Sequence, residues 1–227
     1  MSLRHHGPQD MPAVIQLARY LISHNQHWVS ATVGKPGAGK SDFNMCLAIA
    51  IQAPAPFVPR KQIAMRPMDR KAVSMNLAKG RVVMDDESTG KGGHRRRSMS
   101  TENVDNAQDF DAMRGRNQAT LLTGPDFQDL DTVQQKHCKM VFDVRHDHTA
   151  TAYEVVQSGK PNNRYWNLAE AFVIDEMPHA AVLYPKEWAA YSEMKNDFLR
   201  GQDVAKKQRD AIWQDKANKT ILDVLRL

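Results

Sequence analysis

The strongest constraint on the fold is a glycine-rich run near the start of the chain, Gly34-Lys35-Pro36-Gly37-Ala38-Gly39-Lys40-Ser41. It matches the pattern G-x-x-x-x-G-K-[ST] in full. Residues 28–33, which precede it, are typical of a short buried strand, and the apolar residues 42–52 that follow are typical of a helix. A strand, a glycine-rich turn and a helix in this order form half of a βαβ unit, which favours an α/β fold.

The residue types of this loop suit a phosphate group. Glycines allow backbone N–H groups to converge on phosphate oxygens, and the N-terminus of the following helix adds positive potential. Lys40 can reach the β- and γ-phosphates, and Ser41 can place its hydroxyl on Mg²⁺. We therefore expect ATP and Mg²⁺ to bind here, with nucleotide contacts from Gly34, Lys35, Pro36, Gly37, Ala38, Gly39, Lys40, Ser41 and Asp42.

A second acidic element completes the pattern of a nucleoside triphosphatase. The stretch Val82-Val83-Met84-Asp85-Asp86-Glu87 is a short apolar strand that ends in acids. In open α/β sheets ligands bind at the carboxyl ends of the strands. Two registers are possible. In the favoured one, Asp86 holds Mg²⁺ through water and Glu87 polarises the attacking water. In the other, Asp85 and Asp86 take these roles.

The alternation of strand and helix patterns up to residue 144 predicts a mostly parallel sheet with helices on both faces. We expect a lead-in and helix at 1–27, an ATPase core at 28–183 and a helical segment at 184–227. Strands are expected at 28–33, 61–65, 81–85, 119–123, 138–144, 152–157 and 172–174, with a loop at 160–166. Helices are expected at 12–22, 42–52, 69–79, 101–114, 130–136, 185–200 and 203–227.

Composition narrows the class of protein. The chain has 227 residues, 41% hydrophobic and 25% charged, which excludes wholesale disorder and suggests one main domain. The formal charge of +5 permits a polyanionic partner such as nucleic acid. Cys46 and Cys138 are expected to be reduced core residues. The longest apolar run, residues 45–51, is far below the roughly 18 residues of a membrane span, so a protein of the cytoplasm without a transmembrane segment is expected.

Taken in order, these motifs resemble a known group of proteins. The phosphate loop is followed by the Asp-Glu strand end, then by Arg114-Gly115-Arg116 at the end of a predicted helix, and then by the apolar strand at 119–123. This order is similar to that of the FtsK/HerA superfamily of P-loop motors. The group includes DNA translocases and the small genome-packaging ATPases of membrane-containing, double-jelly-roll viruses. The resemblance covers about residues 28–145.

The resemblance implies several further properties. A RecA-like ATPase of this group assembles as a ring, here expected to be a homo-hexamer, and moves double-stranded DNA. Arg114 or Arg116 would be the arginine finger that reaches a neighbouring subunit's nucleotide; alternatively, both solvate a helix end. The γ-phosphate sensor of the group is a glutamine. Here the strand ends in Thr123-Gly124-Pro125, so Thr123 or Gln128 takes that role.

A basic run follows the acidic strand end, at Lys91 and at Arg95, Arg96 and Arg97. Arginines on a glycine-containing loop can clamp the DNA backbone, because phosphate contacts supply most sequence-independent affinity. Two other interpretations are open: one of these arginines is the finger that acts on the neighbouring subunit, or the run is a solvated loop.

The sequence therefore predicts an α/β, RecA-like P-loop ATPase that translocates double-stranded DNA and packages a viral genome into a capsid. Its expected partners are DNA, further copies of itself, and a capsid or membrane vertex protein, in the host cytoplasm or on the virion. The alternatives are a plasmid or mobile-element DNA-transfer ATPase, a P-loop switch or assembly factor that moves no DNA, and a small-molecule kinase. Glu87 favours hydrolysis over transfer.

Overall fold

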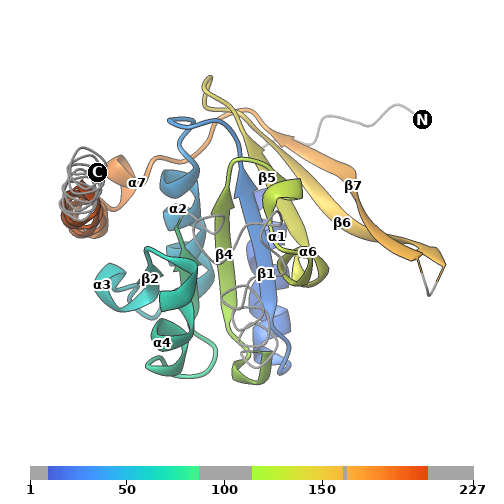
Figure 1. The fold of residues 1–227 in the computed structure, drawn as a ribbon, viewed down its shortest axis with the longest axis horizontal. Coiled ribbons are helices and arrows are strands. Elements are labelled where there is room, and N and C mark those ends of the chain that lie inside the picture. The colour runs from blue at the N-terminus through green and yellow to red at the C-terminus, as the bar shows by residue number, and fades with distance from the viewer. Residues whose placement is uncertain (1–9, 87–113, 161–162, 204–227) are drawn as a thin grey trace, which may run out of the picture.

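The computed structural model describes residues 10–86, 114–160 and 163–203. Within these residues a seven-stranded sheet forms the centre of the molecule, in the order β2-β3-β4-β1-β5-β6-β7 (Figure 1). The strands are β1 Trp28–Val33, β2 Ile63–Ala64, β3 Val82–Asp85, β4 Ala119–Gly124, β5 Met140–Val144, β6 Ala150–Lys160 and β7 Asn163–Ile174.

The five strands from β2 to β5 run parallel, and β6 and β7 are added antiparallel at one edge. The mostly parallel α/β fold predicted from the sequence is thus confirmed. β4 lies between β1 and β3 and pairs with both. The carboxyl ends of these three parallel strands consequently meet at one edge of the sheet, where the phosphate loop follows β1.

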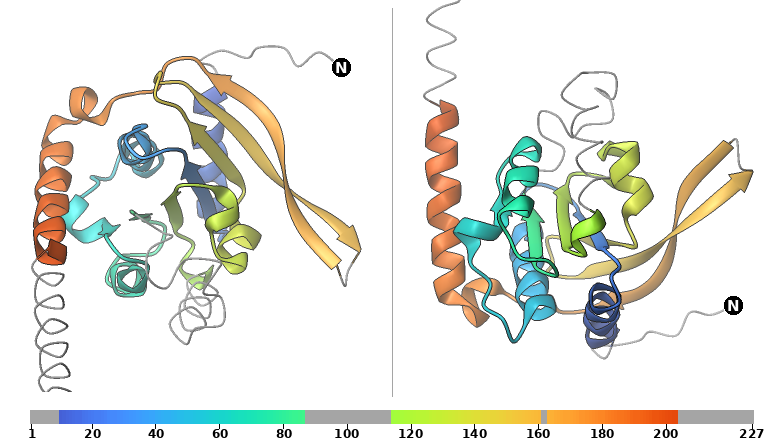
Figure 2. Two further views of the ribbon diagram at one scale, coloured as in Figure 1. Left: turned by 45° about the horizontal axis from the view of Figure 1, so that its top comes forward. Right: turned by 90° about the horizontal axis from the view of Figure 1, so that it is seen from below.

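Helices cover both faces of the sheet, as Figure 2 shows from two further directions. They are α1 Asp10–Ser23, α2 Lys40–Gln52, α3 Pro59–Gln62, α4 Arg70–Met75, α6 Thr132–His137 and α7 Ala180–Leu183, with short 3-10 turns at Pro67–Asp69, Arg114–Arg116 and Phe127–Asp129. Residues 185–203 form a further helix, which we call the covering helix. In Figures 1 and 2 it lies on the same side of the molecule as α3.

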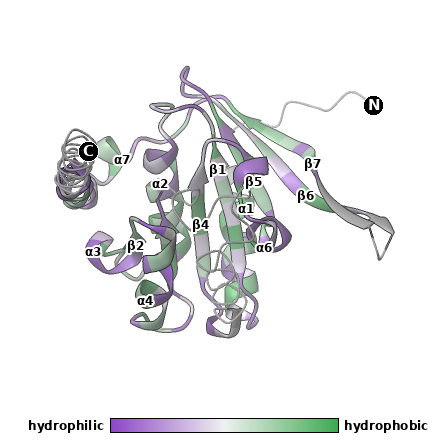
Figure 3. Ribbon diagram, in the orientation of Figure 1, coloured by the Kyte–Doolittle hydropathy of each residue, from purple (hydrophilic) through white to green (hydrophobic). Residues whose placement is uncertain are grey.

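Two hydrophobic clusters hold these layers together. Side chains alternate across a strand, so neighbouring residues of β1 enter different clusters. Trp28 packs with α1 and α2 on one face, whereas Val29 packs with Leu130 and Cys138 on the other. The rings of Phe43 in α2 and Phe142 in β5 lie 5.1 Å apart. Figure 3 shows that α3 and α6, on the outside of the sheet, are largely hydrophilic.

Most predicted elements appear within a few residues of their expected bounds. The strand at 28–33 is β1, and the helix expected at 42–52 begins two residues earlier, at Lys40. The helix expected at 69–79 ends at Met75, because the chain turns through residues 76–80 before β3. The edge strand expected at 61–65 is reduced to Ile63–Ala64, since Pro59–Gln62 is helical.

The prediction of a loop at 160–166 is wrong. Lys160 ends β6, and residues 163–166 belong to β7, so the two strands form one long hairpin. β5 pairs only with Ala150–Glu154 of β6, and the rest of the hairpin is paired within itself and projects from the body (Figures 1 and 2). The backbone pairing continues along this part, from Val155 opposite Leu168 to Lys160 opposite Asn163.

Two predicted helices, at 101–114 and 203–227, lie outside the described residues except at their first or last residue. Arg114 is the first described residue after this gap and belongs to the 3-10 turn Arg114–Arg116. Among the described residues, none of the helices combines the length and apolar character that a bilayer crossing requires.

Candidate nucleotide site

The phosphate loop connects β1 to α2 and adopts a backbone that requires glycine. Gly34, Gly37 and Gly39 have φ values of 141°, 82° and 92°. At Gly34 there is a steric reason as well, because a Cβ atom would lie 2.3 Å from the carbonyl oxygen of Val144 in β5. The spacing of the glycines in the motif therefore reflects left-handed backbone and a close approach to the neighbouring strand.

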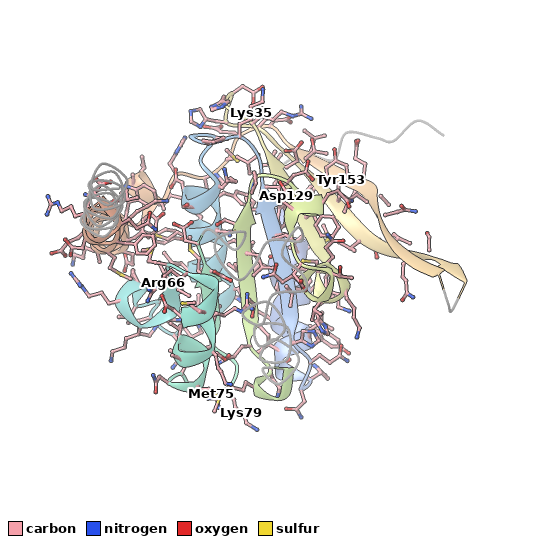
Figure 4. All side chains as sticks on the ribbon, in the orientation of Figure 1. Lys35, Arg66, Met75, Lys79, Asp129 and Tyr153 are labelled. Atoms are coloured by element: carbon pink, nitrogen blue, oxygen red, sulfur yellow. The ribbon has the colours of Figure 1, made fainter. Side chains whose placement is uncertain are left out.

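The loop leads directly into the N-terminus of α2, a helix of 13 residues with Gly39 as its N-cap. Lys40 is its first residue, and its Nζ donates to the carbonyl oxygens of Gly34 at 2.8 Å and Lys35 at 2.9 Å. The ammonium group is thus folded back over the loop. Lys35 itself is exposed, at the edge of the molecule opposite Met75 and Lys79 (Figure 4).

Asp86, directly after β3, connects three parts of the chain. Its Oδ1 accepts hydrogen bonds from the Ser41 hydroxyl at 2.8 Å and the Thr123 hydroxyl at 3.2 Å. Its Oδ2 accepts from the Tyr191 hydroxyl at 2.8 Å and from Lys195 Nζ at 2.9 Å. The carboxylate is only 3% exposed. The phosphate-loop serine and the second acid of the strand end, which the sequence predicted to share Mg²⁺, therefore lie side by side.

Asp85 has different surroundings, although it is the adjacent residue. Its Oδ2 accepts from Nη1 of Arg70 in α4 at 2.7 Å, and both side chains are buried. The hydroxyl of Ser41 is bonded to Asp86. The geometry favours the register in which Asp86, rather than Asp85, is the candidate metal ligand; the metal role of either residue stays a prediction.

The groups around Asp86 keep their protons. Burial raises the pKa of Tyr191, and the Asp86 carboxylate raises it further, while Lys195 lowers it in part. Burial lowers the pKa of Lys195, but the Asp86 carboxylate and the Tyr191 hydroxyl raise it more, so the net shift is upward. Tyr191 is consequently a neutral hydroxyl donor and Lys195 a cation over the physiological pH range.

A pocket of about 660 Å³ opens at this point, between the phosphate loop and the covering helix. One wall is the loop, the base is formed by the ends of β3 and β4, and the other wall is the covering helix. The lining residues of this last wall are Trp188, Tyr191, Ser192, Lys195, Asn196 and Leu199. None of these residues was predicted in the site; the signal that could have drawn attention to them is the spacing of Trp188, Tyr191 and Lys195, which places all three on one face of a helix.

Asp42, predicted as part of the nucleotide contact, has another partner. Its carboxylate accepts from His179 Nδ1 at 2.9 Å and from the backbone N–H of Ala180. It therefore fixes the start of α7 to the first turn of α2. Asp42 still lines the pocket, but its carboxylate is committed to the segment that leads into the covering helix.

The remaining predicted residues divide into three groups. Thr123 lines the pocket and bonds to Asp86, whereas Gln128 lies exposed on the 3-10 turn Phe127–Asp129. Arg116 precedes β4, at the edge of the sheet opposite the phosphate loop, and its guanidinium donates to the carbonyl oxygen of Leu77. Outside the residues whose side chains are described lie Glu87, Lys91, Arg95, Arg96, Arg97 and Arg114.

No family model matches this sequence, and no curated protein is significantly similar to it. Solved structures with a similar course of the chain include the N-terminal domain of zonular occludens toxin from Neisseria meningitidis, at 12% identity and a TM-score of 0.39, covering 63% of this chain and 94% of that one. A second is a chain of the HORMA:CdnC:Trip13 complex of E. coli MS115-1, at 11% identity and a TM-score of 0.42. The match covers 60% of this chain and 62% of that one. A third is the genome packaging NTPase B204 from Sulfolobus turreted icosahedral virus 2 in complex with ATP-gammaS, at 10% identity and a TM-score of 0.38. The match covers 62% of this chain and 96% of that one.

Proposed function

We propose that this chain is a Mg²⁺-dependent ATPase that binds ATP on the loop Gly34–Ser41. The observation that carries the proposal is the 2.8 Å hydrogen bond between Ser41 and Asp86, at the end of β3. It joins a phosphate loop of the required backbone to an acid that the sequence predicted independently. A hydroxyl and a carboxylate are hard oxygen ligands, so this donor set fits Mg²⁺.

In this proposal each residue has a defined task. The backbone of residues 34–40 and the N-terminus of α2 bind the phosphates, and Lys40 turns from the loop carbonyls to the β- and γ-phosphates. Ser41 and Asp86 would hold the magnesium ion, which supplies charge neutralisation on the phosphate oxygens. Glu87 is proposed to orient and deprotonate the attacking water, and Thr123 to sense the γ-phosphate.

We further propose that hydrolysis drives movement of double-stranded DNA, with genome packaging as the favoured role and plasmid transfer as the alternative. The support is the resemblance of residues 28–145 to the FtsK/HerA superfamily, the formal charge of +5 and the basic run at Lys91 and Arg95–Arg97. A ring of identical subunits, with Arg114 or Arg116 acting on the neighbouring nucleotide, belongs to the same proposal.

A second candidate function is a nucleotide-controlled switch that moves no DNA. The observation that favours it is the contact of the covering helix with Asp86, through Tyr191 and Lys195. A helix that shares a carboxylate with the candidate metal site is well placed to respond to nucleotide. In this case the output would be the docking of a partner rather than translocation.

ATP turnover measured with and without double-stranded DNA, at low and high salt, distinguishes the DNA-translocating motor from the switch. A motor predicts stimulation by DNA that falls with salt, because phosphate contacts release counterions. Replacing Arg95, Arg96 and Arg97 by Ala should weaken DNA binding and flatten its salt slope by about one unit per lost phosphate contact. Turnover that is indifferent to DNA would favour the switch, and phosphate transfer to an acceptor other than water would identify a kinase.

A further inference from the structure

The carboxylate of Asp86 is saturated with hydrogen bonds. An ionised carboxylate has about four lone-pair sites. Four donors already point at this one: the hydroxyls of Ser41 and Thr123 at Oδ1, and the hydroxyl of Tyr191 and the ammonium of Lys195 at Oδ2. A metal ion, or a water bound to it, can therefore bond to Asp86 only if one of the four donors leaves.

The donors differ in how easily they leave. Ser41 and Thr123 belong to α2 and β4, which are fixed in the core. Tyr191 and Lys195 both belong to the covering helix, so displacement of that helix, which includes lifting the buried Tyr191 ring out of the core, frees the whole of Oδ2. Lys195 is also the one cation among the four, and two positive charges at a single carboxylate repel each other. Its side chain is 31% exposed, so it has an open path away from the site.

From this geometry we propose that the covering helix is an autoinhibitory element, in which Lys195 occupies the cation position at Asp86 until Mg²⁺ and nucleotide displace it. The inference rests on the proposed function of the site and adds its regulation. In the closed state Lys195 is the cation that balances Asp86, and Tyr191 holds it in place with a 3.0 Å hydrogen bond. Binding of Mg²⁺ with nucleotide and closure of the helix are then mutually exclusive.

The way in which the covering helix is attached suits this role. At its start, Tyr184 is a non-helical residue between α7 and residue 185. α7 is in turn bonded to Asp42 in the first turn of α2, so the hinge is fixed to the helix that carries the phosphate loop. Farther along, the ion pair between Arg60 and Glu193 is exposed and contributes little. The principal polar contact of the helix with the core is therefore the one with Asp86.

The test compares Lys195→Met with Lys186→Met, an exposed lysine on the same helix. Binding of a fluorescent ATP analogue, N-methylanthraniloyl-ATP, is titrated with Mg²⁺ and again with EDTA. Lys195→Met should bind the analogue with Mg²⁺ about tenfold more tightly than the wild type, equivalent to about 1.4 kcal/mol. No tightening is expected in EDTA, and Lys186→Met should match the wild type under both conditions.

Hydrogen exchange of the wild-type protein, followed by mass spectrometry, gives a readout that does not depend on a variant. Addition of Mg²⁺ and the ATP analogue should increase exchange in peptides from residues 185–203, whereas addition of the analogue with EDTA should not. Equal affinities of wild type and Lys195→Met, or weaker binding by Lys195→Met, would overturn the autoinhibitory role; the weaker binding would make Lys195 a nucleotide ligand. If neither protein binds nucleotide at all, the proposed function fails, and this inference fails with it.

Discussion

The buried ion pair between Arg70 and Asp85 should make Asp85 a structural residue, and Asp85→Asn tests this. The two side chains are 1% and 0% exposed, and the atoms are 2.7 Å apart. The substitution keeps the size of the side chain but leaves the guanidinium buried beside a neutral amide. Removing one partner of a buried pair costs about 3–5 kcal/mol. For a chain of 150–250 residues each kcal/mol lowers Tm by about 2–4 °C, so we expect a fall of about 6–20 °C.

Thermal unfolding followed by circular dichroism measures this fall. The matched control is Arg66→Met, which breaks the ion pair between Arg66 and Asp69. Its N–O distance of 2.8 Å is close to that of the buried pair, but its side chains are 56% and 35% exposed. Exposed pairs contribute about 0–1 kcal/mol, so the control should lower Tm by at most about 4 °C. The double variant Arg70→Met/Asp85→Asn should regain part of the loss. A Tm of Asp85→Asn within about 2 °C of the wild type would show that the Arg70–Asp85 ion pair contributes little to stability.

Two further predictions concern the loop and the thiols. Gly34→Ala should lower the free energy of unfolding by about 1–3 kcal/mol or more, because the φ of Gly34 is 141° and the added Cβ would lie 2.3 Å from a carbonyl oxygen. Urea unfolding measures this loss, with Gly115→Ala as the control, since a Cβ there would have no atom within 4 Å. Equal unfolding midpoints of the two variants would contradict the prediction. Burial, with a smaller contribution from Asp42, raises the pKa of Cys46 to about 12, and burial also raises that of Cys138. At pH 8 both are therefore thiols, and neither should react with a disulfide reagent until urea is added; rapid labelling of the folded protein would show that the core is open.

The glycine-rich turn at 34–41 and the central strands could be predicted because their signals are local. The glycines of the motif correspond to left-handed backbone, and the strand at 28–33 is buried at every residue, as a central parallel strand should be. The acidic end of β3 was also predicted, but the sequence left open whether Asp85 or Asp86 is the candidate metal ligand. Asp85 and Asp86 are adjacent in sequence, and what distinguishes them is Arg70 on one side and Ser41 on the other.

The covering helix shows what the sequence could not reveal. Its residues predicted a helix over 185–200, and it forms over 185–203. Nothing in its pattern indicates which surface it packs on, because Tyr191 and Lys195 lie more than 100 residues from Asp86. The β6–β7 hairpin was underestimated for a related reason: its outer part is held by backbone hydrogen bonds, which leave no trace in the order of side chains.

In the proposed function, the pocket beside Ser41 and Asp86 binds and hydrolyses ATP. The most direct test is the release of inorganic phosphate from ATP, with Mg²⁺ and with EDTA, by the wild type, Lys195→Met and Lys40→Ala. Release should require Mg²⁺ and occur in the first two proteins. It should fall at least about 100-fold in Lys40→Ala, because Lys40 is expected to stabilise charge on the phosphates. Release that is absent from all three, or unchanged in Lys40→Ala, would contradict the proposed function.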